Sequence, residues 1–185
     1  MTADHHRLRE AITEELDRID RIAAQLWDGD CDFTADSGHP GWSFGHVAAH
    51  IARGSDFLAG VLLTLSSGSD ELRNNALERS DEIDREATRP GAVIITDFEQ
   101  AAHRFAHSID TVPEDRWSST RVATGRISAS VEDIIEIWLQ EMRIHVPALT
   151  LGHEQDSRAP RSQCLITDFL PETAHPPRPA GGDRP

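Results

Sequence analysis

The residues that could do chemistry in this chain are histidines, carboxylates and arginines. Its 185 residues include ten histidines and 18 basic side chains, every one of them an arginine, and there is neither lysine nor tyrosine. Schiff-base chemistry, a pyridoxal phosphate anchor, a Walker-type phosphate loop and a tyrosine general acid are therefore excluded. Neither Cys31 nor Cys164 has the helix-start context or the nearby histidine that activates a nucleophilic thiol.

The sharpest chemical signal lies in the segment 131–145. At about 100° per residue, Ile134 and Trp138 fall within about 60° of Glu141, so the apolar face of the predicted helix centres on a carboxylate. His145 follows one turn later on the same face, about 40° away. A carboxylate is costly to bury without a partner. We therefore expect Glu141 to be paired, either with His145 alone in a hydrogen bond or with a metal ion.

A second predicted helix, over residues 43–65, offers a further ligand. His50 stands beside its apolar stripe, about 20° from Val61. Two helices that face one core can bring His50, Glu141 and His145 together. Two imidazoles and a carboxylate with one position left for water or substrate are typical of a catalytic zinc site. The alternative for His50 is a hydrogen-bonded core histidine that binds no metal.

Two other histidine pairs have the same one-turn spacing. His46 precedes His50 but points about 40° further from the apolar stripe, so we expect it beside the site or on the surface. His103 and His107 lie about 140° to 180° from Phe98, on the polar face of their helix, and are expected to be solvated. The terminal and loop histidines that give no signal are His5, His6, His153 and His175.

Four predicted helices position these residues. Apolar side chains recur at steps of three and four over residues 4–27, which predicts an amphipathic helix. Ser43 can cap the second helix. Thr96 and Glu99 have the spacing of a capping box, which would open a third helix that ends near residue 110.

The fourth helix is expected to begin after Ser130 and to end or kink at Pro147. A short helix around residues 70–77 and a small β-hairpin around Gly125 are predicted in the connections. Four long helices joined by long loops favour an all-α fold, a four-helix bundle. We expect the bundle to span residues 1–153.

The last part of the chain differs in composition. Six of the ten prolines lie between Pro160 and Pro185. Such a segment cannot bury enough apolar surface to build a core. Residues 154–185 are therefore predicted to form a proline-rich, partly disordered tail.

The net charge of the chain limits the classes of molecule that it could bind. With 18 basic and 32 acidic side chains, the formal net charge is −14, which disfavours nucleic acid and anionic membranes. No stretch approaches the roughly 20 apolar residues of a spanning helix, and the N-terminus lacks the apolar run of a signal peptide. We expect a cytoplasmic protein that acts on a small molecule; pairing as a homodimer is neither required nor excluded.

Four blocks of sequence follow one another within about residues 5–155: GWSFGHVAAHIARGSDFL, RSDEI, EDRW and EMRIH. Together they resemble the metal-binding domain of the mycothiol-dependent maleylpyruvate isomerase family, in the wider DinB-like four-helix superfamily. The resemblance implies that His50, Glu141 and His145 bind zinc or another divalent metal such as nickel. It also implies mycothiol as a thiol cosubstrate. Arg79, within RSDEI, would contact cofactor or substrate, and its alternative is a solvated loop arginine.

The family resemblance implies a reaction type. A metal-activated thiol adds to a cis double bond beside a carbonyl, the bond rotates, and elimination gives the trans isomer; related proteins transfer the thiol instead. Substrate carboxylates would have to meet arginines, and Arg53, Arg79 and Arg143 are nearest by sequence, although Arg143 points away from the core stripe.

The chain also departs from the family pattern. Ala148 stands where the family usually has aspartate, Pro147 is unusual there, and the proline-rich tail does not correspond to the isomerase's second domain. Two hypotheses follow: a metal-dependent thiol enzyme, isomerase or transferase, and a non-catalytic bundle that a metal stabilises.

Overall fold

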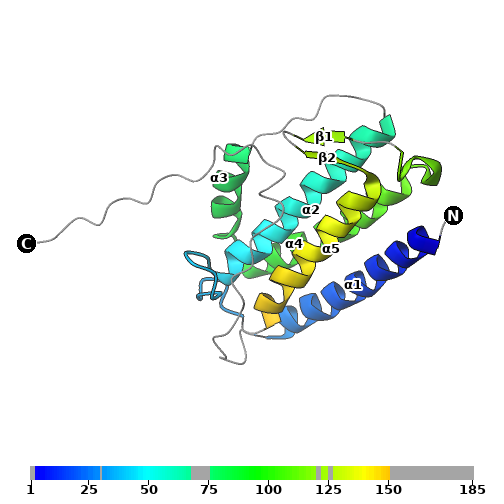
Figure 1. Cartoon of the computed structure of the whole chain (residues 1–185). Coiled ribbons are helices and arrows are strands. Elements are labelled where there is room, and N and C mark those ends of the chain that lie inside the picture. Colours follow the sequence, from blue (N-terminus) through cyan, green and yellow to red (C-terminus); the bar gives the residue numbers. More distant parts are fainter. Residues whose placement is uncertain (1–2, 30, 68–75, 120–121, 125–126, 151–185) are drawn as a thin grey trace, which may run out of the picture.

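Four long helices build the core of the computed structural model, which confirms the predicted all-α bundle (Figure 1). Most interhelical contacts pair α1 and α2 with both α4 and α5, so that each long helix packs between two others. The helices are α1 (Ala3–Asp28), α2 (Phe44–Ser67), α4 (Gly91–Asp110) and α5 (Val131–Thr150). The structure describes residues 3–29, 31–67, 76–119, 122–124 and 127–150.

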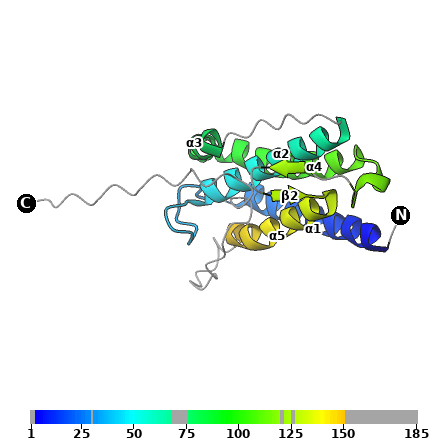
Figure 2. The same cartoon turned by 45° about the horizontal axis from the view of Figure 1, so that its top comes forward.

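The shorter elements lie in the connections between the long helices. Helix α3 (Ala76–Glu86) packs against α2 (Figure 2). Of the short helix predicted at residues 70–77, all but the last two residues lie outside the described part of the chain, and α3 begins at Ala76. A 3-10 turn, Glu114–Arg116, precedes the antiparallel pair β1 (Val122–Thr124) and β2 (Ile127–Ala129), so the predicted hairpin before the last helix is confirmed.

Helix α4 begins earlier than the sequence pattern predicted. Pro90 takes the N-cap position, and Thr96 lies inside the helix, where its hydroxyl donates to the carbonyl of Ala92 at 2.8 Å. The predicted capping box at Thr96 is therefore wrong. The physical reason is burial: Ile94 and Ile95 are each only 4% exposed, and their packing extends the helix toward its N-terminus, beyond the local capping signal.

Helix α5 begins where the pattern predicted. The Ser130 hydroxyl accepts a hydrogen bond from the Asp133 amide at 3.1 Å, and the Asp133 carboxylate accepts one from the Ser130 amide at 2.8 Å. The expectation that Pro147 could end the helix is wrong, because α5 continues to Thr150. A proline costs one backbone hydrogen bond, but Ala148 and Leu149 beyond it are buried and keep the last turn packed.

Two tryptophans fix the centre of the bundle. Trp138 of α5 is fully buried, stacks on Phe105 with ring centroids 4.7 Å apart, and donates its indole N–H to the Ser55 hydroxyl at 2.9 Å. Trp117 is also fully buried and donates to the carbonyl of Val112 at 3.1 Å. Through its two contacts, Trp138 ties the apolar face of α5 to α2 and α4.

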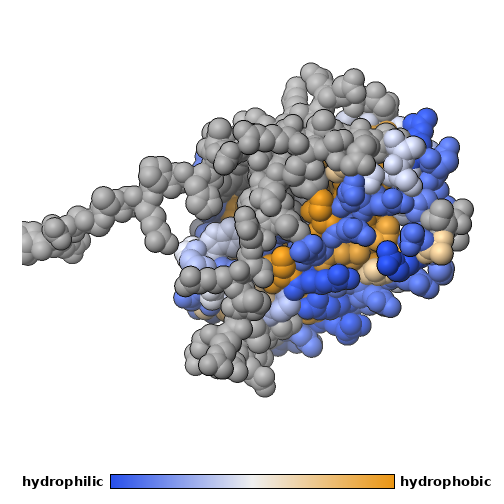
Figure 3. All heavy atoms as spheres, in the orientation of Figure 1, coloured by the Kyte–Doolittle hydropathy of each residue, from blue (hydrophilic) through white to orange (hydrophobic). Residues whose placement is uncertain are grey.

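The outer surface follows the amphipathic pattern of the helices. Figure 3 shows hydrophilic side chains along α1 and hydrophobic ones along the neighbouring α5. No helix in the described part of the chain is long and apolar enough to cross a membrane. The predicted boundary after residue 153 and the proline-rich tail, residues 154–185, lie outside the described residues.

Candidate metal centre

The three predicted metal ligands meet between α2 and α5. His50 comes from the first half of α2, and Glu141 and His145 come from successive turns of α5. Each side chain is at most 5% exposed. One ligand atom from each lies within 4.8 Å of the others. The residues selected by helical periodicity are therefore together in space, in the interior of the bundle.

The distances around Glu141 suit a metal ion. Its Oε2 atom lies 3.4 Å from Nε2 of His50 and 3.3 Å from Nε2 of His145. A tetrahedral zinc with bonds of about 2.0–2.2 Å holds its ligand atoms about 3.3–3.6 Å apart. One carboxylate oxygen thus lies at ligand-to-ligand distance from both imidazoles.

The hydrogen bonding of His145 gives an independent test of fit. Both of its ring nitrogens are buried and have no hydrogen-bond partner among the described residues. Buried polar atoms are normally paired, so an imidazole of this kind beside a buried carboxylate needs a further partner. A divalent cation fits, because it would bind a ring nitrogen of His145 and offset the charge of Glu141.

Two residues of the loop that precedes α2 lie beside the three predicted ligands. The Trp42 ring is 5.0 Å from that of His50 and 6.4 Å from that of His145. The His39 ring is 5.2 Å from that of His145. Burial, followed by the nearby His145 and His50, lowers the pKa of His39. The sequence interpretation missed His39, since a loop residue shares no helical stripe with the ligands.

His46, His103 and His107 lie on the helix faces that their spacing predicted. His46 is turned toward the start of α2, where its Nδ1 lies 2.8 Å from the Ser43 hydroxyl, and its Nε2 lies 3.7 Å from Asp84. It is not among the clustered ligand atoms. His103 and His107 are exposed on α4, and His103 pairs with a carboxylate of α1 at 2.7 Å. A one-turn spacing of histidines therefore indicates a metal site only where the pair lies on a buried helix face.

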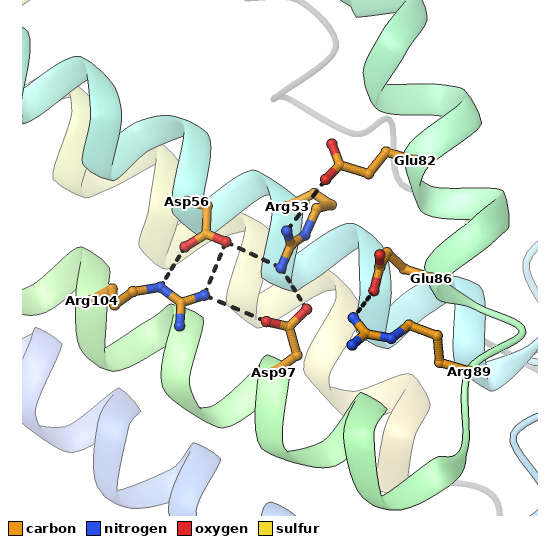
Figure 4. A network of polar contacts seen from close by, with 7 residues as sticks. All are labelled: Arg53, Asp56, Glu82, Glu86, Arg89, Asp97 and Arg104. Carbon is orange, nitrogen blue, oxygen red and sulfur yellow. Dashed lines mark hydrogen bonds and ion pairs between the residues drawn. The ribbon is translucent and has the colours of Figure 1, made fainter.

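Arg53 does not face the site as a free cation. Its guanidinium lies 3.1 Å from Asp56, 2.5 Å from Asp97 and 3.4 Å from Glu82. Arg104 also binds Asp56, at 2.8 Å. Figure 4 shows how these side chains join α2, α3 and α4. The network occupies Arg53 with protein carboxylates, so the expectation that it could meet a substrate carboxylate is not supported.

Arg143 and Arg79 are the two other arginines that could meet a substrate carboxylate. Arg143 is exposed, in agreement with its predicted direction away from the core. Arg79 lies on α3, which packs against α2, but its side chain is outside the described residues. Its role stays a prediction.

Comparison with known proteins places this chain in a family. The model of the mycothiol maleylpyruvate isomerase N-terminal domain matches residues 12–147. The chain belongs to this family. Its fold is similar to that in the crystal structure of the mycothiol-dependent maleylpyruvate isomerase, with a TM-score of 0.68 and 23% sequence identity over 80% of this chain. A histidine-to-alanine mutant of that enzyme matches with the same TM-score and 22% identity.

The match covers only part of the solved enzyme. This chain spans 63% of the length of either crystal structure. No curated protein matches the sequence. At this identity the solved structures establish the bundle fold, and the reaction has to be argued from the site.

Proposed function

We propose that this family member is a divalent-metal-dependent thiol enzyme that acts on an electrophilic small molecule. The observation that carries the proposal is the meeting of Glu141 Oε2 with Nε2 of both His50 and His145, at 3.4 Å and 3.3 Å. Zinc is the metal that this ligand set suits best, and two imidazoles and one carboxylate leave a position for a further ligand. When bound, zinc would lower the pKa of a thiol and hold it as thiolate at neutral pH.

The chain's own residues would prepare that thiol for reaction. His50 and His145 each offer a ring nitrogen, and Glu141 adds one negative charge, which leaves the loaded site with a net charge of about +1. Trp42 covers the imidazole of His50 on the loop side. The burial of all three ligands excludes water from them and strengthens every charge interaction in the site.

The family supports mycothiol as the thiol cosubstrate. Isomerisation of a cis double bond beside a carbonyl, or transfer of the thiol to an electrophile, are the two reaction types that a metal-held thiolate serves. We also propose that Arg79 contacts thiol or substrate. The enzyme would act in the cytoplasm on small molecules, without nucleic acid or membrane as partner, and a homodimer remains compatible with it.

The first experiment measures metal. We expect the purified protein to bind about one zinc per chain, and His50→Ala and His145→Ala to lose it. His103→Ala is the matched control, because this histidine is exposed on α4 and should leave zinc unchanged. Full zinc occupancy in both ligand variants would overturn the site.

The second candidate function is a non-catalytic bundle that the metal stabilises. Two observations favour it: the chain spans 63% of the solved isomerase, and the family's aspartate position holds Ala148, which is buried. Turnover separates the two candidates. The zinc-loaded protein is incubated with mycothiol and maleylpyruvate or other electrophiles. Thiol-dependent product supports the enzyme, and zinc binding without any thiol-dependent product supports the second candidate.

A further inference from the structure

His39 lies next to the proposed metal centre without belonging to its ligand set. Its ring centroid is 5.2 Å from that of His145. Among the residues that the structure describes, the ligand atoms that lie within 4.8 Å of one another nevertheless come from His50, Glu141 and His145 only. His39 is half-buried, whereas the three ligands are fully buried. His39 is therefore the more exposed neighbour of the three buried residues.

The loop that carries His39 is held by its own backbone. Gly38 and Gly41 flank the turn with φ angles of +80° and +81°, a region that favours glycine. The Trp42 amide donates to the carbonyl of His39 at 3.0 Å, and the Ser37 hydroxyl and amide both donate to the carbonyl of Trp42, at 2.8 Å and 3.1 Å. These bonds position His39 without using its side chain.

The imidazole of His39 is free for a ligand. Within the described part of the chain it has no hydrogen-bond partner, since only its backbone groups are bonded, to Ser37 and Trp42. An imidazole can donate from one nitrogen and accept at the other. Trp42, whose ring centroid lies 6.3 Å from that of His39, supplies an apolar surface nearby.

We propose that His39 is a further substrate-contacting residue, which forms a hydrogen bond with a thiol bound at the proposed metal centre, beside His145. This inference rests on the proposed function. The thiol would meet a polar group in His39 and an aromatic surface in Trp42. The indole would carry the apolar contact, and the imidazole would orient the sulfur toward the second substrate.

The test compares thiol binding with metal content. The probe is 2-mercaptoethanol, titrated calorimetrically into the zinc-loaded, full-length protein. His39→Leu keeps the bulk of the side chain and removes the hydrogen bond, and we expect it to bind the thiol about tenfold more weakly, as loss of a hydrogen bond to a charged group predicts. His39→Gln should recover part of the affinity. Zinc content and the melting temperature should match the wild type in both.

The controls separate this inference from the proposed function. His103→Leu, which alters an exposed histidine far along α4, should bind both zinc and thiol normally. Normal zinc with unchanged thiol affinity in His39→Leu would overturn the role of His39 and leave the metal centre standing. Loss of zinc in His39→Leu and His39→Gln would make His39 a metal ligand and would also overturn the proposal. A wild-type protein without zinc, or zinc-loaded protein that binds no thiol, would overturn the proposed function itself.

Discussion

Glu141 shows how the burial of one residue leads to its chemistry. Its side chain is 1% exposed, and Trp138 and Met142 beside it are fully buried. Removing an ion from water costs several kcal/mol even after the protein relaxes. Imidazole nitrogens on two helices lie within 3.4 Å of its carboxylate. A cation bound among the three side chains would offset this cost, so the proposed metal would stabilise the folded core as well as serve the proposed reaction.

Glu15 provides a pH-dependent prediction. Burial raises its pKa above the ordinary 4.5, an effect larger than the lowering by Arg18. The folded state then binds more protons than the unfolded state above pH 4.5, so this group lowers stability as the pH rises through its folded pKa. We expect Glu15→Gln to be more stable than the wild type at pH 7, by less than about 1 kcal/mol, with the difference shrinking toward pH 4.5. Urea unfolding of both proteins at pH 7 and pH 5 measures it. If Glu15→Gln were less stable than the wild type at pH 7, the stabilisation by the Arg18 ion pair would exceed the cost of burying the Glu15 carboxylate.

The helices that hold the proposed metal centre were predictable because their faces are periodic. On α5, one apolar stripe decides the direction of Glu141 and His145 together, and the α2 stripe does the same for His50. Burial of a whole stripe involves many side chains, so no single contact can turn the helix. The same reasoning correctly separated the exposed pair His103 and His107 from the buried ligands.

Residues outside such stripes were not predictable. His39 is brought to the site by a turn, and a turn has no period from which its direction could be read. His5 gave no signal at the chain terminus, yet it is 4% exposed, with its Nε2 2.9 Å from Glu132 and its ring 4.8 Å from Trp117. The start of α4 was misplaced for a related reason: Thr96 fits a local capping pattern, but tertiary burial of the residues before it decides where the helix begins.

The contrast between two helix starts gives a prediction for stability. Ser130 caps α5 through the Asp133 amide, so Ser130→Ala should cost about 1 kcal/mol. Thr96→Ala should be close to neutral, because Thr96 lies within α4 and alanine is the better helix former there. Chemical denaturation of both variants against the wild type measures the difference. Equal losses in the two variants would contradict the assigned starts of α4 and α5.

The charge of the protein as a whole opposes the local charge of its site. The formal net charge is −14, whereas the zinc-loaded ligand set would carry about +1. Arg53 and Arg104 do not reverse the field near α2, because carboxylates of the same network bind both guanidinium groups. An anionic thiol would therefore approach against a long-range repulsion that a neutral thiol does not meet. A neutral sugar conjugate such as mycothiol suits this surface.

Ionic strength should reveal this opposition. Raising it from about 0.01 M to 0.15 M shortens the screening length from about 30 Å to 8 Å, which removes distant repulsion and leaves contacts inside the site nearly unchanged. We expect the zinc-loaded protein to bind mercaptoacetate more tightly as salt rises, while its affinity for uncharged 2-mercaptoethanol stays constant. Calorimetric titration of each thiol at both ionic strengths measures this, and the neutral thiol corrects for any effect of salt on the metal. Weaker binding of mercaptoacetate at high salt would contradict the prediction, because it would mean that a local cation, such as the proposed Arg79, dominates the field at the entrance.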